Sequence, residues 1–192
     1  ADHCDNTGGG SPGDSTEVLQ TFLELGLEDA LILYLVDPEV AVQAHEVGAG
    51  ETITVSLGGK SDPVQGMPVD CTAEVVAVTT GEFAYDGPML AGLTGTMGLS
   101  AWLKIGGVNV VVVTAREQPY DMAFSRTLGI DCAAMRYICV KSAAHFRAAF
   151  EPIAGSIHNI DASGIHTHRF ADLVFQKRQP EMFPVEIPAD ES

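Results

Sequence analysis

The sequence predicts an α/β fold, with a mixed sheet, helices on its faces and a β-rich antiparallel middle section. Two strand-length runs, 30–36 (ALILYLV) and 135–140 (MRYICV), are mainly apolar, which is typical of strands covered on both faces. Segments of helical spacing adjoin these runs, whereas residues 51–115 contain alternating or β-branched stretches separated by glycine turns. We therefore expect α/β ends around a β-rich centre, all within one domain of residues 1–192.

The first third of the chain is expected to form a loop, a helix, a strand and a second helix. Apolar residues recur at helical spacing over residues 17–25, and Asp14 or Ser15 is expected to cap this helix with a side-chain oxygen. The strand at 30–36 stops at an Asp-Pro pair. Because proline suits the first position of a helix, the second helix is predicted over 38–45.

The middle section is expected to be antiparallel. Its predicted strands cover residues 51–57, 69–78, 99–105 and 108–113. The last two of these strands flank a Gly-Gly pair, which signals a hairpin. A short stretch at 82–85 is expected to pair with the strand at 69–78.

The last third returns to the α/β pattern. A short helix is expected before the strand at 135–140, and residues 141–147 (KSAAHFR) then turn into another helix. Ser142 is placed as the N-cap of that helix, with His145 one turn later on the same side. Residues 156–160 resemble a final strand.

Composition excludes several classes of protein. A net charge of −16 argues against binding to nucleic acid or to anionic membranes. No apolar run approaches the roughly 20 residues that span a membrane, and no signal segment opens the chain. The four cysteines lack C-x-x-C spacing, so a reducing, cytoplasmic setting is the default. The proline-containing segment after Arg169 is expected to be an irregular surface tail.

The first sixteen residues are a polar, glycine-dense loop ahead of the first helix. Gly8, Gly9 and Gly10 allow a backbone that lies close against another body. Such a loop is expected to present N–H groups at the positive end of a helix, where an anionic group can bind. It is not a nucleotide P-loop, because Asp14 replaces the lysine that reaches the phosphates and no hydrophobic strand precedes it.

Two strings identify a family. Residues 5–14 (DNTGGGSPGD) and 141–147 (KS-x-x-HFR) resemble the C-terminal domain of the MlrC (microcystinase C)-like zinc metallopeptidases. The Asp-Pro pair after the first strand and the Gly-Gly-Lys string at 58–60 match in the same order, so the resemblance covers nearly all of the chain. It implies a zinc-bearing N-terminal domain that normally precedes this segment. A start at Ala1, directly on the loop, suggests an excised domain.

The resemblance implies a hydrolase of peptide or amide bonds, with a peptide-like substrate. The zinc ligands are expected outside this chain, and no metal is expected on this domain, which would supply binding groups and one wall of the cleft. The implied catalytic residues are His145 and Lys141. The implied substrate-binding residues are Asp5, Asn6, Gly8, Gly9, Gly10, Ser142 and Arg147.

Other interpretations stay open from the residues alone. Lys141 and its neighbours could serve structure only, with Ser142 as a cap and Arg147 paired to an acid, and Asp5 could bond the N–H groups of its own loop. A Ser–His nucleophile pair is disfavoured, because no G-x-S-x-G string surrounds the serine.

A metal site and a non-catalytic role complete the alternatives. His166 and His168, with Asp161 or His158, could hold a metal, but an exposed polar turn is the preferred interpretation and no H-E-x-x-H motif occurs. The alternative function is a non-catalytic module that binds a small anion or forms a homodimer through its β-rich middle.

Overall fold

A single mixed sheet organises the chain. The computed structural model describes residues 1–170 and 173–177. Its six-stranded sheet has the order β2-β3-β6-β7-β1-β8. The strands of this sheet are β1 (Ala30–Val36), β2 (Thr52–Leu57), β3 (Val69–Thr79), β6 (Ser100–Ile105), β7 (Val108–Val113) and β8 (Tyr137–Val140). β1 runs parallel to β7 and β8, and the other neighbours are antiparallel. The expected mixed α/β fold is confirmed.

The central strands bury both of their faces. On β1, Ile32 and Leu35 belong to one apolar cluster, whereas Leu31 and Leu33 belong to the cluster on the opposite face. The pairing of β1 with β7 shifts register between Leu33 and Leu35, which restores the alternation after Tyr34. Burial on both faces explains why the sequence of β1 is apolar throughout.

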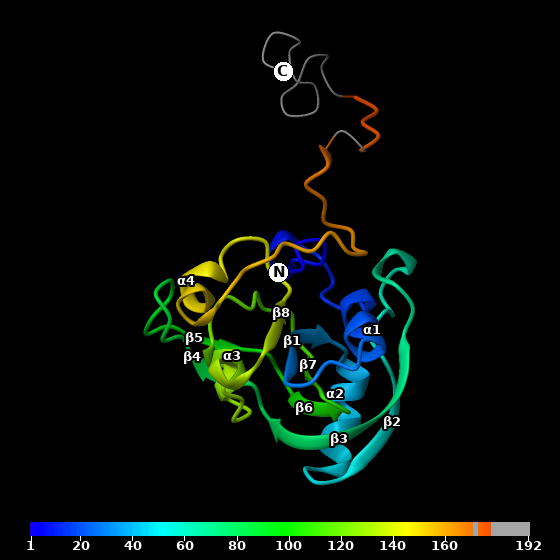
Figure 1. Ribbon diagram of the computed structural model, residues 1–192, viewed down its shortest axis with the longest axis vertical. Coiled ribbons are helices and arrows are strands. Elements are labelled where there is room, and N and C mark those ends of the chain that lie inside the picture. Colours follow the sequence, from blue (N-terminus) through cyan, green and yellow to red (C-terminus); the bar gives the residue numbers. More distant parts are fainter. Residues whose placement is uncertain (171–172, 178–192) are drawn as a thin grey trace.

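Helices cover both faces of the sheet (Figure 1). One face carries α1 (Glu17–Glu24) and α2 (Pro38–Val47). The other face carries α3 (Ala123–Arg126), α4 (Arg147–Phe150) and a small antiparallel sheet of β4 (Glu82–Ala84) and β5 (Thr94–Thr96). Short 3-10 turns are η1 (Thr7–Gly9), η2 (Pro63–Gln65), η3 (Cys132–Ala134) and η4 (Glu151–Ile153).

The N-terminal loop and the chain after α4 lie side by side at one end of the sheet (Figure 1). An isolated parallel bridge joins Asp2 to Ile160. The Ile160 amide donates to the Ala1 carbonyl at 2.8 Å, and the His166 amide donates to the Cys4 carbonyl at 3.0 Å. These bonds bring residues from the two ends of the described chain together.

Three local predictions were wrong. β4 pairs with β5 and not with β3, because Phe83 packs beside Phe124 in the apolar cluster that covers one face of the sheet. Residues 156–160 form only the single bridge at Ile160. The N-cap of α1 is Thr16, without a side-chain cap bond, because Asp14 and Ser15 are bonded elsewhere.

The segment after β8 also differs from its prediction. α4 begins only at Arg147, and its N-cap is Phe146, so Ser142 does not cap this helix and His145 precedes it. Of the tail expected after Arg169, most lies outside the described residues. Within the described part of the chain, no helix is long and apolar enough to cross a membrane.

Candidate functional site

The loops at the carboxyl ends of β7 and β8 converge on the N-terminal loop, as expected for a parallel part of a sheet. Lys141 and Ser142 follow β8, and Gln118 lies in the loop after β7. Asp37, at the end of β1, bonds to the segment after β2 and not to this group. Its carboxylate accepts hydrogen bonds from the Gly58 amide at 2.9 Å and from Lys60 Nζ at 3.0 Å.

Lys141 is fully buried and tied to the N-terminal loop. Its Nζ lies 2.9 Å from Asp5 Oδ2 and 3.1 Å from Asp2 Oδ2, and both of these acids are also buried. It donates further to Ser15, to the carbonyl at 3.0 Å and to Oγ at 2.5 Å. The ammonium is therefore fully occupied by the protein itself and does not face a substrate.

The opposite charges of Lys141 and its aspartate partners stabilise their charged forms. Burial acts to lower the pKa of Lys141, but the carboxylates of Asp2 and Asp5 outweigh it and raise that pKa. Burial likewise acts to raise the pKa of Asp5, and Lys141 together with the Ser15 and Gly13 amides outweighs it and lowers that pKa. The lysine and Asp5 thus stay charged inside the protein.

Asp5 and Asp14 fix the N-terminal loop through hydrogen bonds. Asp5 accepts hydrogen bonds from the amides of Gly13 and Ser15, each at 2.8 Å, and from Gln65 Nε2 at 2.6 Å. Asp14 accepts from the amides of Lys60 at 2.9 Å and Ser61 at 2.8 Å. The strings that resemble the family are therefore bonded to one another, and Asp5 bonds its own loop, as the structural alternative stated.

The N–H groups of the glycine turn donate hydrogen bonds within the turn itself. The Gly8 amide donates to Asn6 Oδ1 at 3.1 Å, the Gly9 amide donates to the Asn6 carbonyl at 2.9 Å, and the Gly10 amide donates to the Thr7 carbonyl at 3.1 Å. The expectation of amides presented to an anion was wrong, because the 3-10 turn η1 satisfies them. The turn itself is exposed and open to close approach.

An exposed polar group lies beside this turn. Gln118 Nε2 lies 2.9 Å from the Oγ of buried Ser142 and 3.1 Å from Nδ1 of exposed His145. When Gln118 donates to Nδ1, the neutral ring carries its proton on Nε2. His145 is then a candidate hydrogen-bond donor, held by a glutamine that is itself bonded to Ser142.

The glycines allow this packing. A Cβ on Gly8 would lie 2.2 Å from the side-chain oxygen of Gln118, and a Cβ on Gly9 would lie 2.6 Å from the His166 ring. Gly10 has a φ of +96°, a conformation that suits glycine. Arg147, in contrast, lies partly exposed over the Phe146 ring and 4.0 Å from Glu151, so its guanidinium is apart from the lysine cluster.

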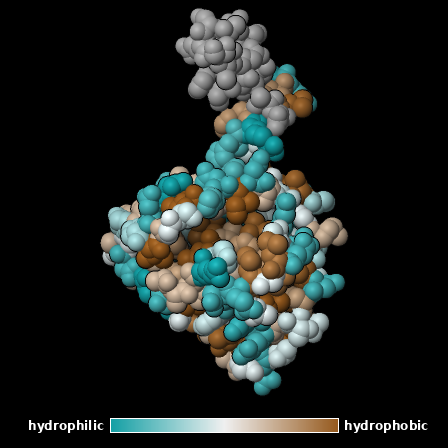
Figure 2. All heavy atoms as spheres, viewed as in Figure 1, coloured by the Kyte–Doolittle hydropathy of each residue, from teal (hydrophilic) through white to brown (hydrophobic). Residues whose placement is uncertain are grey.

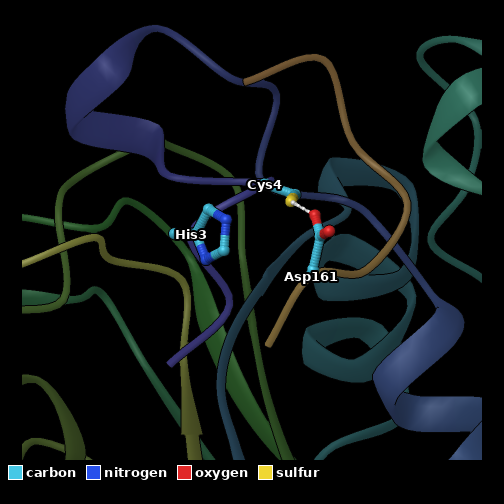
Figure 3. A group of neighbouring side chains, drawn as sticks. All are labelled: His3, Cys4 and Asp161. Atoms are coloured by element: carbon cyan, nitrogen blue, oxygen red, sulfur yellow. Dashed lines mark hydrogen bonds between the residues drawn. The ribbon is translucent and has the colours of Figure 1, made fainter. Parts of the chain in front are cut away.

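A second group of polar side chains combines both ends of the chain. His3, Cys4 and Asp161 each offer a metal-ligand atom, and these atoms lie within 4.8 Å of one another. Figure 3 shows the Cys4 thiol facing the Asp161 carboxylate, with His3 beside them. Among the described residues this is the one such group, and it shares only Asp161 with the disfavoured alternative of His166 and His168 with Asp161 or His158. The His168 ring lies against His3, with centroids 4.6 Å apart.

Protonation decides what Cys4 can do. Burial, followed by the hydrogen bond to Asp161, raises the pKa of the Cys4 thiol to about 11. Burial, followed by neighbouring His168, lowers the pKa of His3. Without a bound cation the thiol stays protonated at neutral pH, so Cys4 is not a nucleophile of the papain type.

A separate hollow in the surface is mainly apolar. A cavity of about 480 Å³ adjoins the edge strand β8 and is lined mainly by apolar side chains, among them Phe22, Ile138, Phe150 and Ile153. Figure 2 shows this hydrophobic hollow on the face that carries β8. Its lining suits an apolar group or segment, not the polar chemistry around His145.

Sequence reasoning missed four residues of these two sites. Gln118 was not proposed as a site residue, although its place after β7, which runs parallel to β1, is a signal for such residues. Gln65 comes from the β-rich section and reaches Asp5. His3 and Cys4 gave no signal, because their partner Asp161 is 157 residues away.

The fold and its polar surface define an α/β domain with an open site at the carboxyl ends of β7 and β8. The chain belongs to the MlrC C-terminus family, whose model matches residues 1–177. The expected family is thereby confirmed.

Two relatives place this domain within longer proteins. The chain is 28% identical over 185 residues to Microcystinase C of a Sphingomonas species, and the match covers 96% of this chain and 35% of that protein. A crystal structure from a Mesorhizobium species, provisionally assigned as a metallopeptidase, is similar with a TM-score of 0.81 at 26% identity. That match covers 98% of this chain and 37% of the other.

Proposed function

We propose that this chain is the C-terminal domain of a zinc-dependent hydrolase of peptide or amide bonds and forms one wall of its active-site cleft. The observation that carries the proposal is exposed His145, hydrogen-bonded to half-buried Gln118, beside the exposed glycine turn. Family membership and the metallopeptidase assignment of the structural relative support the reaction class. The cytoplasm is the proposed location.

Zinc does not fit a site at His145 in this chain. Its hydrogen-bonded neighbours there are Gln118 and Ser142, an amide and a hydroxyl, which are not the usual ligands of zinc. We therefore assign the catalytic zinc to the remainder of a longer protein, corresponding to the part of Microcystinase C that this chain does not cover. There it would supply activation of water and polarisation of the scissile carbonyl.

The residues of this chain then have separate roles. His145 contacts the reacting amide and donates a hydrogen bond from Nε2 to the developing negative charge. Gln118 and Ser142 fix its ring, and Gly8 to Gly10 let a peptide backbone approach closely. Arg147 is the proposed partner of a substrate carboxylate.

Lys141, Asp5 and Asn6 are positioning residues in this proposal. Lys141 and Asp5 hold the N-terminal loop against the end of β8 through buried ion pairs. Asn6 closes the glycine turn through its bond to the Gly8 amide. None of the three needs to touch a substrate to shape the cleft wall.

The purified 192-residue chain is expected to be catalytically silent, because it lacks the proposed zinc domain. The measurement is hydrolysis of a panel of linear peptides by this chain alone and by the longer protein that carries both parts. Turnover by the longer protein only is the expected result. Hydrolysis by the chain alone, lost in His145→Ala, would place the whole centre in this domain and overturn the assignment.

The alternative function is a non-catalytic assembly module, and the apolar cavity beside edge strand β8 is the observation that favours it. In that case a second copy would cover the cavity and the chain would be a dimer. Sedimentation analysis of the chain and of Ile153→Asp tests this, because the variant would be monomeric. A wild-type chain that is monomeric at all concentrations contradicts the alternative. The glycine turn does not support the other version of this alternative, a module that binds a small anion, because its amides already donate hydrogen bonds within the turn.

A further inference from the structure

Two distant segments of the chain are fixed against each other around three metal-ligand side chains. The segment His3–Cys4 comes from the N-terminal loop, and Asp161 follows the bridge at Ile160. The bonds from the Ile160 amide to Ala1 and from the His166 amide to Cys4 lie on either side of the cluster. The backbone that carries these side chains is therefore defined without any ligand.

Close packing adds to this definition. A Cβ on Gly164 would lie 2.1 Å from the Cys4 carbonyl oxygen, so the loop after Asp161 sits directly on the Cys4 backbone. Nδ1 of His166 lies 2.8 Å from the His3 carbonyl oxygen. Since these contacts use backbone atoms of His3 and Cys4, their side chains remain available for a ligand.

The spacing suits a tetrahedral ion. The Cys4 thiol lies 3.4 Å from Asp161 Oδ1, and the three ligand atoms lie within 4.8 Å of one another. Zinc bonds of about 2.0–2.3 Å at tetrahedral angles separate ligand atoms by roughly 3.3–3.8 Å. A small rotation of the partly exposed His3 side chain would bring the set to this spacing.

The chemical types of the three ligands limit which metal ions the site can bind. Thiolate and imidazole favour zinc-class ions over Mg²⁺ and Ca²⁺, which prefer oxygen. One imidazole nitrogen of His3, Sγ of Cys4 and one carboxylate oxygen would leave a fourth position, and Asp161 keeps its other oxygen beside Arg169 at 3.4 Å. A further imidazole, that of His168, lies against the His3 ring.

We propose that His3, Cys4 and Asp161 form a binding site for a thiophilic divalent metal ion of the zinc class. The ion binds the Cys4 thiolate, and the thiol proton passes to water. It joins the two ends of the folded domain, directly beneath the glycine turn that His166 contacts. This site belongs to the chain itself and does not depend on the proposed peptidase function.

The test is titration of the chelator-treated 192-residue chain with Co²⁺, which reports thiolate ligands through a charge-transfer absorption band. We expect one equivalent of Co²⁺ to produce this band and Zn²⁺ to remove it by displacement. The band should be lost in Cys4→Ser, and Asp161→Asn should weaken binding about tenfold or more.

Two matched controls separate this site from others. Cys71→Ser removes a half-buried cysteine on β3, and Glu151→Gln removes an acid that, like Asp161, faces an arginine. Both variants should bind Co²⁺ as the wild type does. His3→Ala, at a partly exposed position, provides a second loss-of-binding variant if Cys4→Ser does not fold.

Two results would overturn the proposal. One is the absence of a thiolate band in the wild-type chain at one equivalent of Co²⁺, which would indicate adventitious binding to surface histidines at most. The other is retention of the band in Cys4→Ser. Neither result bears on peptide hydrolysis by the longer protein, so the two proposals fail separately.

Discussion

A buried lysine can act on a substrate only through the groups that it holds. The ammonium of Lys141 contacts Asp2, Asp5 and Ser15, and all four residues are buried. The lysine of the KS-x-x-HFR string and the aspartate of the DN-x-GGG loop are thus two halves of one ion pair. Their joint presence in the sequence reflects this contact, whichever substrate the site binds.

Removal of this ammonium should be costly. Lys141→Met leaves the carboxylates of Asp2 and Asp5 buried without a counter-charge, and we expect the free energy of unfolding to fall by about 3–5 kcal/mol. Urea denaturation of the chain measures this. The control is Lys104→Met on the exposed side of β6, with an expected change below about 0.5 kcal/mol. A loss for Lys141→Met as small as that of the control would show that the cluster contributes little.

The same cluster predicts a dependence of stability on pH. Asp5 has a lowered pKa, so its contribution is present above its ordinary value of 3.8 and is lost as the pH falls through the folded-state pKa. Lys141 has a raised pKa, so its contribution is present below 10.5 and is lost as the pH rises through the folded-state value.

The stability gap between wild type and Lys141→Met should therefore be widest near neutral pH and shrink as the pH approaches about 4 or about 11. In acid it shrinks because protonation relieves the unpaired carboxylates of the variant. Urea denaturation of both proteins across this range provides the measurement. A gap that stays constant down to about pH 2 would contradict the ion-pair account.

Among the elements, the glycine turn η1 positions Gln118. Gly8→Ala would displace the end of this flexible side chain, since the new Cβ would lie 2.2 Å from its oxygen. We expect stability to change by less than about 1 kcal/mol. Turnover by the longer protein should fall about tenfold or more, because His145 loses its fixed orientation. The control is Gly155→Ala, where a Cβ meets open space. Equal activity of the two variants would remove Gln118 from the site.

The strands and long helices were predictable because the pattern of apolar residues in the sequence matches their buried faces. β1 and β7 are apolar on both faces, and α2 begins at a proline that follows the capping Asp37. The partner of β4 was not predictable. Tertiary packing of Phe83 against Phe124 selects it, and local alternation carries no information about that contact.

The KS-x-x-HFR turn illustrates a further limit. Serine is a favoured N-cap residue, yet Ser142 is buried and bonded to Gln118, and the helix begins only at Arg147. Competition from a side-chain hydrogen bond displaced the expected cap. The metal-ligand group could not be predicted at all. It forms only because the bridge between Asp2 and Ile160 brings two distant segments together.

At the scale of the whole molecule, the domain presents a polar site and an apolar cavity in different places. The polar site lies where β7 and β8 end, and the cavity lies beside the free edge of β8. The chain spans 35% of the length of the curated relative that it matches. If the polar site binds substrate, as we propose, His145 contributes to turnover in the longer protein.

The most direct measurement is peptide turnover together with zinc content for His145→Ala in that longer protein, with His158→Ala as the histidine control. We expect kcat/KM to fall about 100-fold in His145→Ala, while zinc content and stability match those of the wild type. The control should retain activity. Unchanged turnover in His145→Ala, with zinc retained, would contradict the cleft-wall role and leave the domain as a module for assembly.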